Sequence, residues 1–352
     1  MDTLLIAEDD IPMRLVSLAL GEPPDARMQQ GLERLFGPDP QAGLARLTAL
    51  GRELGLAGKL RTALASDAPL AAQAADADIL LLEKTPADAE VIERARRLRL
   101  IQVFGTDCSS VDRAAAARRG IPVLPLRRWV NTSVAEHTLM LLLAVLRRTL
   151  GAHAAASAPP KMRVKPGASY YNWGLLPGVQ GLSGKSLGIL GLGEIGREVA
   201  QLAAAFGMRV SYTQRHRAAA EEEQACRARY ASLQDLLRES DAVSVHLPLT
   251  EATRHFIGAG ELRAMKPGAV LVNTSRGALV DEAALVAALR AGRLGGAGLD
   301  VREEEPPPAA GGFAGLDNVV LSPHVAAGSG EPLLLDTRAV LEHAAEALAR
   351  AT

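Results

Sequence analysis

The fold of this chain is decided by one short stretch, Leu187-Gly188-Ile189-Leu190-Gly191-Leu192-Gly193-Glu194-Ile195-Gly196-Arg197. An apolar strand pattern passes there directly into a helical pattern that ends at Gly207. In a G-x-G-x-x-G turn the first glycine makes the tight turn, the second lets backbone approach a pyrophosphate, and the third lets helix and strand pack. We therefore expect a dinucleotide to bind at this helix N-terminus, on Gly191, Gly193, Glu194, Ile195 and Gly196. The alternative is an ordinary glycine-rich turn.

The next strand ends without the acid that an NAD site usually carries about 20 residues further on, where it binds the ribose hydroxyls. It reads Val210-Ser211-Tyr212-Thr213-Gln214-Arg215-His216-Arg217. Gln214 stands near the expected position, and Arg215 and Arg217 could pair with a 2′-phosphate. This pattern favours NADP(H) as the cofactor, with NAD(H) still possible. The alternative is a solvated basic loop.

Apolar runs rich in Val, Ile and Leu alternate with Ala- and Leu-rich helical stretches on both sides of this turn. This alternation is typical of an α/β fold with parallel sheets covered by helices. Strands are expected at residues 4–7, 78–82, 100–104, 122–124, 187–190, 209–212, 242–245, 269–272 and 296–299. The role of the long helical stretch between residues 11 and 75 stays open.

A helix is expected at about residues 133–150, followed by a segment of Pro, Gly and aromatic residues from Ala158 to Gly178. That segment has too little periodic burial to belong to a sheet. It is either a domain linker or an arm that packs on another subunit.

The composition sets the class of protein. A chain of 352 residues with 48% hydrophobic residues can build two domains, each with its own core. The 39 Lys and Arg balance 40 Asp and Glu, which speaks against binding to nucleic acid or to an anionic membrane. Two cysteines form neither a disulfide framework nor a metal-ligand pattern. With no signal-peptide pattern and no apolar run of about 20 residues, we expect a cytoplasmic protein.

Three segments of the second half follow apolar strands and carry groups for acid–base chemistry. Arg276 follows one strand, several acids in residues 300–305 follow another, and His324 follows a third. Hydride transfer to a 2-keto acid needs a cation to polarise the carbonyl and an acid to protonate the alkoxide. Taken singly, Arg276 could be a surface charge, Glu305 one of three solvated acids, and His324 a loop histidine.

In this order, the segments 191–196, 246–250, 273–277, 298–306 and 322–324 resemble those of the D-isomer-specific 2-hydroxyacid dehydrogenases. Residues 112–121 and 134–138 also resemble that family, and the likeness extends from about Leu100 to Ala327. Five ordered segments are far more specific than any one of them.

The resemblance implies a role for each matching residue. Arg276 would bind the substrate and polarise its carbonyl, Glu305 would pair with the catalytic histidine, and His324 would be the general acid and base. Asp300 would lie beside the nicotinamide carboxamide. Other residues would line the cofactor, namely His246, Pro248, Thr253 and Thr274.

The loop after residue 103 departs from the family pattern. In relatives this loop is often glycine-rich and its amides hold the substrate carboxylate, so we expect Gly105, Thr106 and Asp107 to contact the substrate. Asp107 stands where a glycine is common. If it points into the active site, it disfavours phosphorylated or dicarboxylic substrates, whereas if it caps a turn, nothing follows.

The family also implies an architecture of two Rossmann-like or flavodoxin-like domains with the active site in the cleft between them. A substrate-binding domain is expected at residues 1–126 plus 327–352, and a dinucleotide-binding domain at 127–326. An arm at about residues 150–181 would support a homodimer.

These expectations combine into one function. We expect an NADPH-preferring enzyme of the glyoxylate and hydroxypyruvate reductase type that converts a small 2-keto acid to the D-2-hydroxy acid. An NAD-dependent 3-phosphoglycerate dehydrogenase is the first alternative, which Asp107 and the missing ribose acid disfavour. A non-catalytic dinucleotide-sensing corepressor is the second, and the complete set of Arg276, Glu305 and His324 disfavours it. The sequence does not name the physiological acid.

Overall fold

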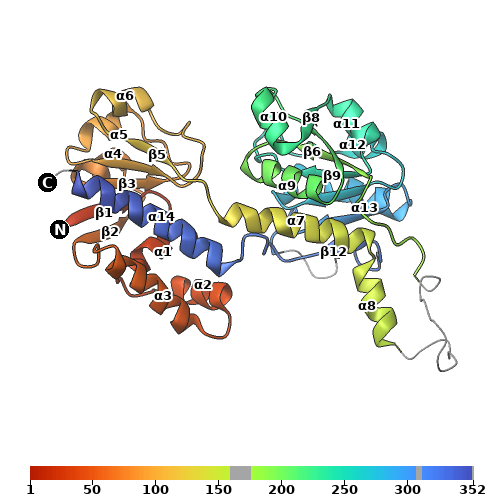
Figure 1. Ribbon diagram of the computed structural model, residues 1–352, viewed down its shortest axis with the longest axis horizontal. Coiled ribbons are helices and arrows are strands. Elements are labelled where there is room, and N and C mark those ends of the chain that lie inside the picture. Colours follow the sequence, from red (N-terminus) through yellow and green to blue (C-terminus); the bar gives the residue numbers. More distant parts are fainter. Residues whose placement is uncertain (159–175, 307–310, 351–352) are drawn as a thin grey trace. The chain divides into compact units, whose positions relative to one another are not determined.

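A computed structural model describes residues 1–158, 176–306 and 311–350 (Figure 1). The chain divides into a first unit, Met1–Val130 with Gly328–Thr352, and a second unit, Asn131–Ala327. Each unit is built on a parallel sheet covered by helices, so the expected α/β class is confirmed. Residues 159–175 of the expected arm lie outside the described residues.

Among the described residues, the first unit holds a five-stranded parallel sheet in the order β2-β1-β3-β4-β5. Its strands are β1 (Asp2–Ile6), β2 (Leu60–Leu64), β3 (Ile79–Leu82), β4 (Leu100–Val103) and β5 (Val123–Pro125). Its helices are α1 (Ile11–Ala19), α2 (Ala26–Phe36), α3 (Pro40–Glu53), α4 (Leu70–Gln73), α5 (Ala89–Arg94), α6 (Arg113–Arg118) and α14 (Gly330–Ala349).

Alternation along the strands divides the core of this unit into two layers. Leu4 and Ile6 of β1 point to the layer shared with α1, α3 and α14, whereas Leu5 points to the layer shared with α5 and α6. Both faces of the sheet are therefore buried, which explains why its central strands are continuous apolar runs. Figure 1 shows the final helix, α14, returning to this sheet from the far end of the chain.

The stretch between residues 11 and 75 is not entirely helical, so that expectation was wrong in one place. It contains α1, α2 and α3, and then the edge strand β2, which pairs with β1. Four of the five residues of β2 are exposed or half-buried. An edge strand needs no second buried face, and its sequence Leu-Arg-Thr-Ala-Leu therefore lacks the apolar run by which the other strands were found.

In its described part, the second unit holds a seven-stranded parallel sheet in the order β12-β11-β10-β9-β6-β7-β8. The strands are β6 (Ser186–Leu190), β7 (Arg209–Thr213), β8 (Ala228–Tyr230), β9 (Ala242–Val245), β10 (Val270–Asn273), β11 (Gly296–Leu299) and β12 (Val319–Leu321). The helices are α7 (Val130–Leu146), α8 (Thr149–Ser157), α9 (Glu194–Ala205), α10 (Ala220–Cys226), α11 (Leu233–Glu239), α12 (Ala259–Ala264) and α13 (Glu282–Arg290).

Helix α7 packs closely on this sheet because β11 carries glycines where the helix crosses it. A Cβ on Gly298 would lie 2.9 Å from Cβ of Leu141, and one on Gly296 would lie 2.5 Å from Cγ1 of Val145. Leu141 is completely buried. The two glycines in the β11 sequence Gly-Ala-Gly-Leu lack side chains and therefore let α7 approach the sheet closely.

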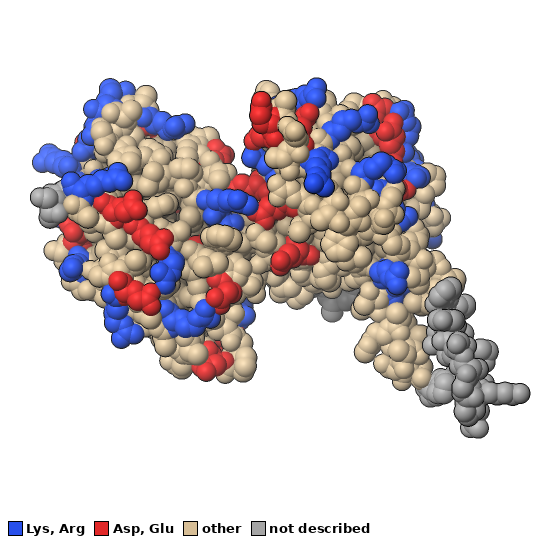
Figure 2. Space-filling view, in the orientation of Figure 1, with Lys and Arg blue, Asp and Glu red and all other residues tan. Residues whose placement is uncertain are grey.

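The expected single helix at residues 133–150 is in fact two helices. α7 ends at Leu146, and α8 begins at Thr149 after Arg148 adopts the left-handed conformation with φ 51°. Among the described residues, no single helix is long and apolar enough to cross a membrane, although α7 and α8 together, bent by 59°, reach the necessary length and composition. On the face drawn in Figure 2, basic and acidic side chains are interspersed over both units.

Candidate active site

The glycine loop between β6 and α9 is shaped for close approach of a bound group. Gly191 has φ 95°, and a Cβ there would lie 2.7 Å from the carbonyl oxygen of His246. A Cβ on Gly196 would lie 2.2 Å from the carbonyl oxygen of Gly191, so the third glycine lets α9 pack against β6. A Cβ on Gly193 would meet no atom of the described residues within 4 Å. This open space at the start of α9, where Glu194 and Ile195 form the first turn, fits a dinucleotide pyrophosphate.

The position expected to bind the ribose is occupied by Gln214, which follows β7. Its Oε1 accepts a hydrogen bond from the backbone N–H of Leu192 at 2.9 Å. The amide therefore joins the end of β7 to the glycine loop. The Gln214 side chain carries no negative charge and so does not itself repel a 2′-phosphate.

The two arginines after Gln214 differ in their surroundings. Arg217 donates two hydrogen bonds, each 2.8 Å long, to the carboxylate of Glu223. These bonds lower the pKa of Glu223 to about 2 and raise the pKa of Arg217. Arg215 is exposed and makes no hydrogen bond or ion pair with the residues that the structure describes. It is therefore the better placed of the two to meet a ligand's phosphate.

The loop after β9 lies next to the glycine loop, since β9 pairs with β6. His246 contacts Oγ of Ser244 through its Nε2 at 2.7 Å. Burial lowers the pKa of His246 to about 4, so the ring is neutral at pH 7. Further along the loop, Oγ1 of Thr253 donates to the carbonyl oxygen of Pro248 at 2.7 Å and fixes the turn.

Arg276 follows β10 on a loop held by buried polar contacts. The fully buried Asn273 donates from Nδ2 to the carbonyl oxygen of Arg276 at 2.9 Å. Next to it, Thr274 is buried and its hydroxyl lies 2.7 Å from that of Thr138. The Arg276 side chain itself is exposed. The loop therefore fixes the backbone and leaves the guanidinium accessible.

Glu305 and His324 form a hydrogen-bonded pair. Nδ1 of His324 lies 2.6 Å from Oε2 of Glu305, while Oε1 of Glu305 accepts from the backbone N–H of Arg302 at 2.9 Å. The side chains of His324 and Glu305 are 48% and 34% exposed, so Nε2 is accessible for proton transfer. A carboxylate on Nδ1 orients the ring and stabilises its protonated form.

Asp300 is buried beneath this pair and holds the backbone that follows β12. Its carboxylate accepts from the backbone N–H groups of Val325 at 3.0 Å and Ala326 at 2.8 Å. Its carbonyl oxygen accepts from the N–H of His324 at 2.7 Å. In this structure Asp300 therefore supports the loop of His324.

The topology brings the three expected catalytic residues to one edge of the second sheet. Strands β10, β11 and β12 are parallel neighbours, and Arg276, Glu305 and His324 each follow one of them. A Cβ on Gly277 would lie 1.8 Å from the carbonyl oxygen of Arg302, so the loop after β10 touches the loop after β11. A cation, a histidine and its carboxylate at one edge can polarise a carbonyl and transfer a proton.

The expected substrate loop of the first unit follows β4. Asp107 accepts a hydrogen bond from the backbone N–H of Ser109 at 2.9 Å, which is the turn-capping arrangement. The carbonyl oxygen of Gly105 accepts from the N–H of Leu126 at 2.9 Å, and Thr106 lies between these anchored positions. The structure thus ties Asp107 to its own loop.

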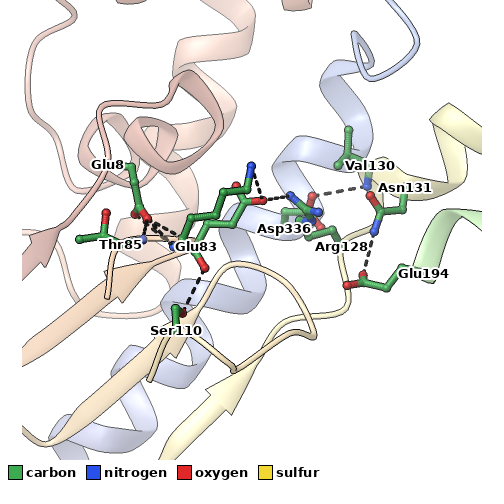
Figure 3. A network of polar contacts seen from close by, with 10 residues as sticks. Glu8, Glu83, Thr85, Ser110, Arg128, Val130, Asn131, Glu194 and Asp336 are labelled. Atoms are coloured by element: carbon green, nitrogen blue, oxygen red, sulfur yellow. Dashed lines mark hydrogen bonds and ion pairs between the residues drawn. The ribbon is translucent and has the colours of Figure 1, made fainter. Parts of the chain in front are cut away.

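Sequence reasoning missed a polar network at the same edge of the first sheet (Figure 3). Glu8, after β1, accepts from the backbone N–H groups of Glu83 and Thr85, after β3. Nη1 of Arg128 lies 3.4 Å from Oε1 of Glu83. Burial, with the nearby Glu83 carboxylate, raises the pKa of Asp10. The available signal was an ionisable side chain soon after the end of a strand, which also marked Arg276 and His324.

The chain is similar to known dehydrogenases and reductases. Residues 139–326 match the family model of the D-isomer specific 2-hydroxyacid dehydrogenase NAD binding domain. The chain is 42% identical to a glyoxylate reductase of Aeropyrum pernix over 75% of this chain and 78% of that protein. It is 40% identical to a glyoxylate reductase of Thermococcus litoralis over 72% and 75%. A crystal structure of a Thermus thermophilus protein is 33% identical, with a TM-score of 0.59 over 97% of this chain and 94% of that one.

Proposed function

Because the chain belongs to the D-isomer specific 2-hydroxyacid dehydrogenase family and is an NAD(P)-dependent oxidoreductase, we propose that it reduces a small, unphosphorylated 2-keto acid with a preference for NADPH. The substrate class is a keto acid of the size of glyoxylate or hydroxypyruvate, and the product is a D-2-hydroxy acid. The relatives named as glyoxylate reductases support this choice.

One observation carries the proposal, namely the 2.6 Å contact between His324 and Glu305 at the sheet edge that also holds Arg276. Arg276 binds the substrate carboxylate through its planar guanidinium and polarises the adjacent carbonyl. When bound, the reduced nicotinamide supplies a hydride to the keto carbon. His324 delivers the proton from Nε2 to the new alkoxide oxygen, and Glu305 stabilises the protonated ring through Nδ1.

The proposed NADPH preference rests on the end of β7. Gln214 is neutral and bonded to the glycine loop, and Arg215 is exposed beside it. A guanidinium pairs well with a phosphate dianion, whereas an NAD site would present a carboxylate to the ribose hydroxyls. The same absence of a carboxylate disfavours the NAD-dependent 3-phosphoglycerate dehydrogenase.

We also propose that the chain forms a homodimer through the second unit. Met140 of α7, Leu150 of α8 and Phe206 after α9 are 43%, 58% and 48% exposed. Leu139, Leu143 and Leu202 line an apolar groove with Met140 and Phe206. Exposed apolar side chains of this kind, with an apolar groove among them, are typical of a protein–protein contact. Light scattering on the purified protein should give twice the mass of one chain, and a monomer would contradict the proposal.

The function is tested by measuring the loss of NADPH or NADH absorbance with glyoxylate, hydroxypyruvate, pyruvate and phosphohydroxypyruvate. We expect turnover with the unphosphorylated keto acids and a higher kcat/KM with NADPH than with NADH. A clear preference for phosphohydroxypyruvate with NADH would contradict the proposal and favour the phosphoglycerate dehydrogenase. Cofactor binding without reduction of any of these acids would also contradict it.

A further inference from the structure

We propose that His137, on α7, is a positioning residue that holds the loop of His324 through a hydrogen-bonded chain formed by Ser322 and Asp300. The inference rests on the proposed function, because it explains how the proton donor of that reaction is kept in place. All members of the chain belong to the second unit, and they come from α7, from the end of β11 and from the end of β12.

The direction of each hydrogen bond in this chain follows from its chemistry. Oγ of Ser322 lies 2.6 Å from Oδ1 of Asp300 and 2.8 Å from Nε2 of His137. An ionised carboxylate only accepts, and a serine hydroxyl has one hydrogen to donate. Ser322 therefore donates to Asp300, and Nε2 of His137 carries the proton that it donates to Ser322. The same nitrogen lies 3.4 Å from Oδ1 of Asp300.

The hydrogen-bonded chain ends on the backbone of the loop that carries His324. The Asp300 carboxylate is completely buried and accepts from the N–H groups of Val325 and Ala326. His324, one residue before them, has φ 54°. A non-glycine residue in that left-handed conformation is strained and persists only where its surroundings hold it. Asp300 supplies this restraint, and Ser322 and His137 fix the orientation of its carboxylate.

Helix α7, which carries the first residue of this hydrogen-bonded chain, is packed tightly on the sheet. The helix packs on the glycines of β11. Thr138, the residue after His137, has its hydroxyl 2.7 Å from that of Thr274 in the loop of Arg276. Two successive residues of α7 therefore contact the loops of both the expected proton donor and the expected substrate arginine. His137 itself is only 16% exposed, so its bond to Ser322 is protected from water.

The first test compares His137→Leu, which removes the donor, with His137→Gln, whose amide can still donate to Ser322. We expect H137L to lower kcat for the keto acid about 10-fold or more, because small displacements of a catalytic group are costly. KM for NADPH and the Tm should change little, and H137Q should recover most of kcat. His343→Leu, which also removes a hydrogen bond of a half-buried histidine but lies in the first unit on α14, is the matched control and should keep the wild-type kcat.

A second readout needs no substrate. The Cε1–H proton NMR signal of His324, which does not exchange with water, should keep one position in the wild type and in H137Q and should shift or broaden in H137L, because the loop of His324 loses its support. Wild-type kcat and an unchanged signal in H137L would overturn the inference. A loss of kcat that follows the Tm equally in H137L and H137Q would also overturn it. If the wild type reduces no keto acid, the proposed function fails, and the NMR comparison still decides the role of His137.

Discussion

The sequence pattern gives Arg215 and Arg217 the same expected role. Within the described part of the structure, Arg217 is hydrogen-bonded to a carboxylate of its own unit, whereas Arg215 is not. Two N–H groups of Arg217 donate to the Glu223 carboxylate and are no longer available to a ligand. The Arg215 side chain is exposed. The difference assigns the proposed recognition of a 2′-phosphate to Arg215. The sequence could mark both residues, but the partner of Arg217 is defined only by the fold of α10 beside β7.

We predict that Arg215→Ala weakens NADPH binding about 10-fold or more and leaves NADH binding unchanged, because it removes a charge-assisted hydrogen bond. Fluorescence titration with each cofactor measures both dissociation constants. Arg229→Ala, on the exposed strand β8, removes the same charge and should change neither constant. Equal losses for NADPH and NADH in R215A would contradict the assignment.

The buried ring of His246 should make the free energy of unfolding depend on pH. Its pKa is about 4 in the folded protein, against 6.5 ordinarily, because burial disfavours the charged ring. Between these values the unfolded state binds a proton that the native state does not. Stability therefore falls as pH falls from 6.5 towards 4, by up to about 3 kcal/mol. Urea unfolding at pH 7 and pH 5 should show a larger loss for the wild type than for His246→Gln. Equal losses would show that His246 is not the cause.

In the turn from β6 to α9, one glycine is needed for packing and another leaves open the space that the proposed cofactor needs. Gly196 faces the carbonyl oxygen of Gly191, whereas Gly193 faces open space. We predict that Gly193→Ala keeps the wild-type Tm but weakens cofactor binding, because its new methyl group occupies the space for the pyrophosphate.

Gly196→Ala should behave in the opposite way to Gly193→Ala. Its methyl group would overlap the backbone of Gly191, so we expect a lower Tm before any specific effect on the cofactor. Thermal unfolding with and without NADPH distinguishes the two variants. The assignment is wrong if G193A loses as much Tm as G196A, or if it binds NADPH as tightly as the wild type.

Elements with a buried, periodic pattern could be predicted from the sequence, and exposed or long-range features could not. The glycine loop and the strand before Arg276 carry strong local patterns, because both faces of the central strands of a parallel sheet are buried. Strand β2 carries none, since it is an edge strand. The contact from His137 to Ser322 spans 185 residues and depends on how α7 crosses β11, which no local pattern encodes.

The first unit is completed by α14, which follows the second unit in the sequence. Asp336 of α14 accepts hydrogen bonds from the backbone N–H groups of Trp129 at 2.6 Å and Val130 at 3.4 Å. These two residues end the first unit before the chain enters the second. One buried carboxylate thus links segments more than 200 residues apart.

We predict that Asp336→Ala lowers the free energy of unfolding of the first unit by about 2 to 3 kcal/mol, because it leaves buried N–H groups without an acceptor. Urea unfolding measures the loss. Glu331→Ala, on the same helix, breaks an exposed ion pair with Arg46 and should cost less than about 1 kcal/mol. An equally small loss in D336A would show that α14 is held by its apolar contacts alone.

The proposed reduction of a 2-keto acid depends most on Arg276, which follows β10 at the sheet edge that also holds Glu305 and His324. The most direct test is the rate of NADPH oxidation by glyoxylate in the wild type and in Arg276→Ala. We predict steady turnover by the wild type and a loss of about 100-fold or more in kcat/KM for the variant, with NADPH still bound. Turnover that survives in R276A, or a wild type that binds NADPH and oxidises it with no keto acid, would contradict the proposed function.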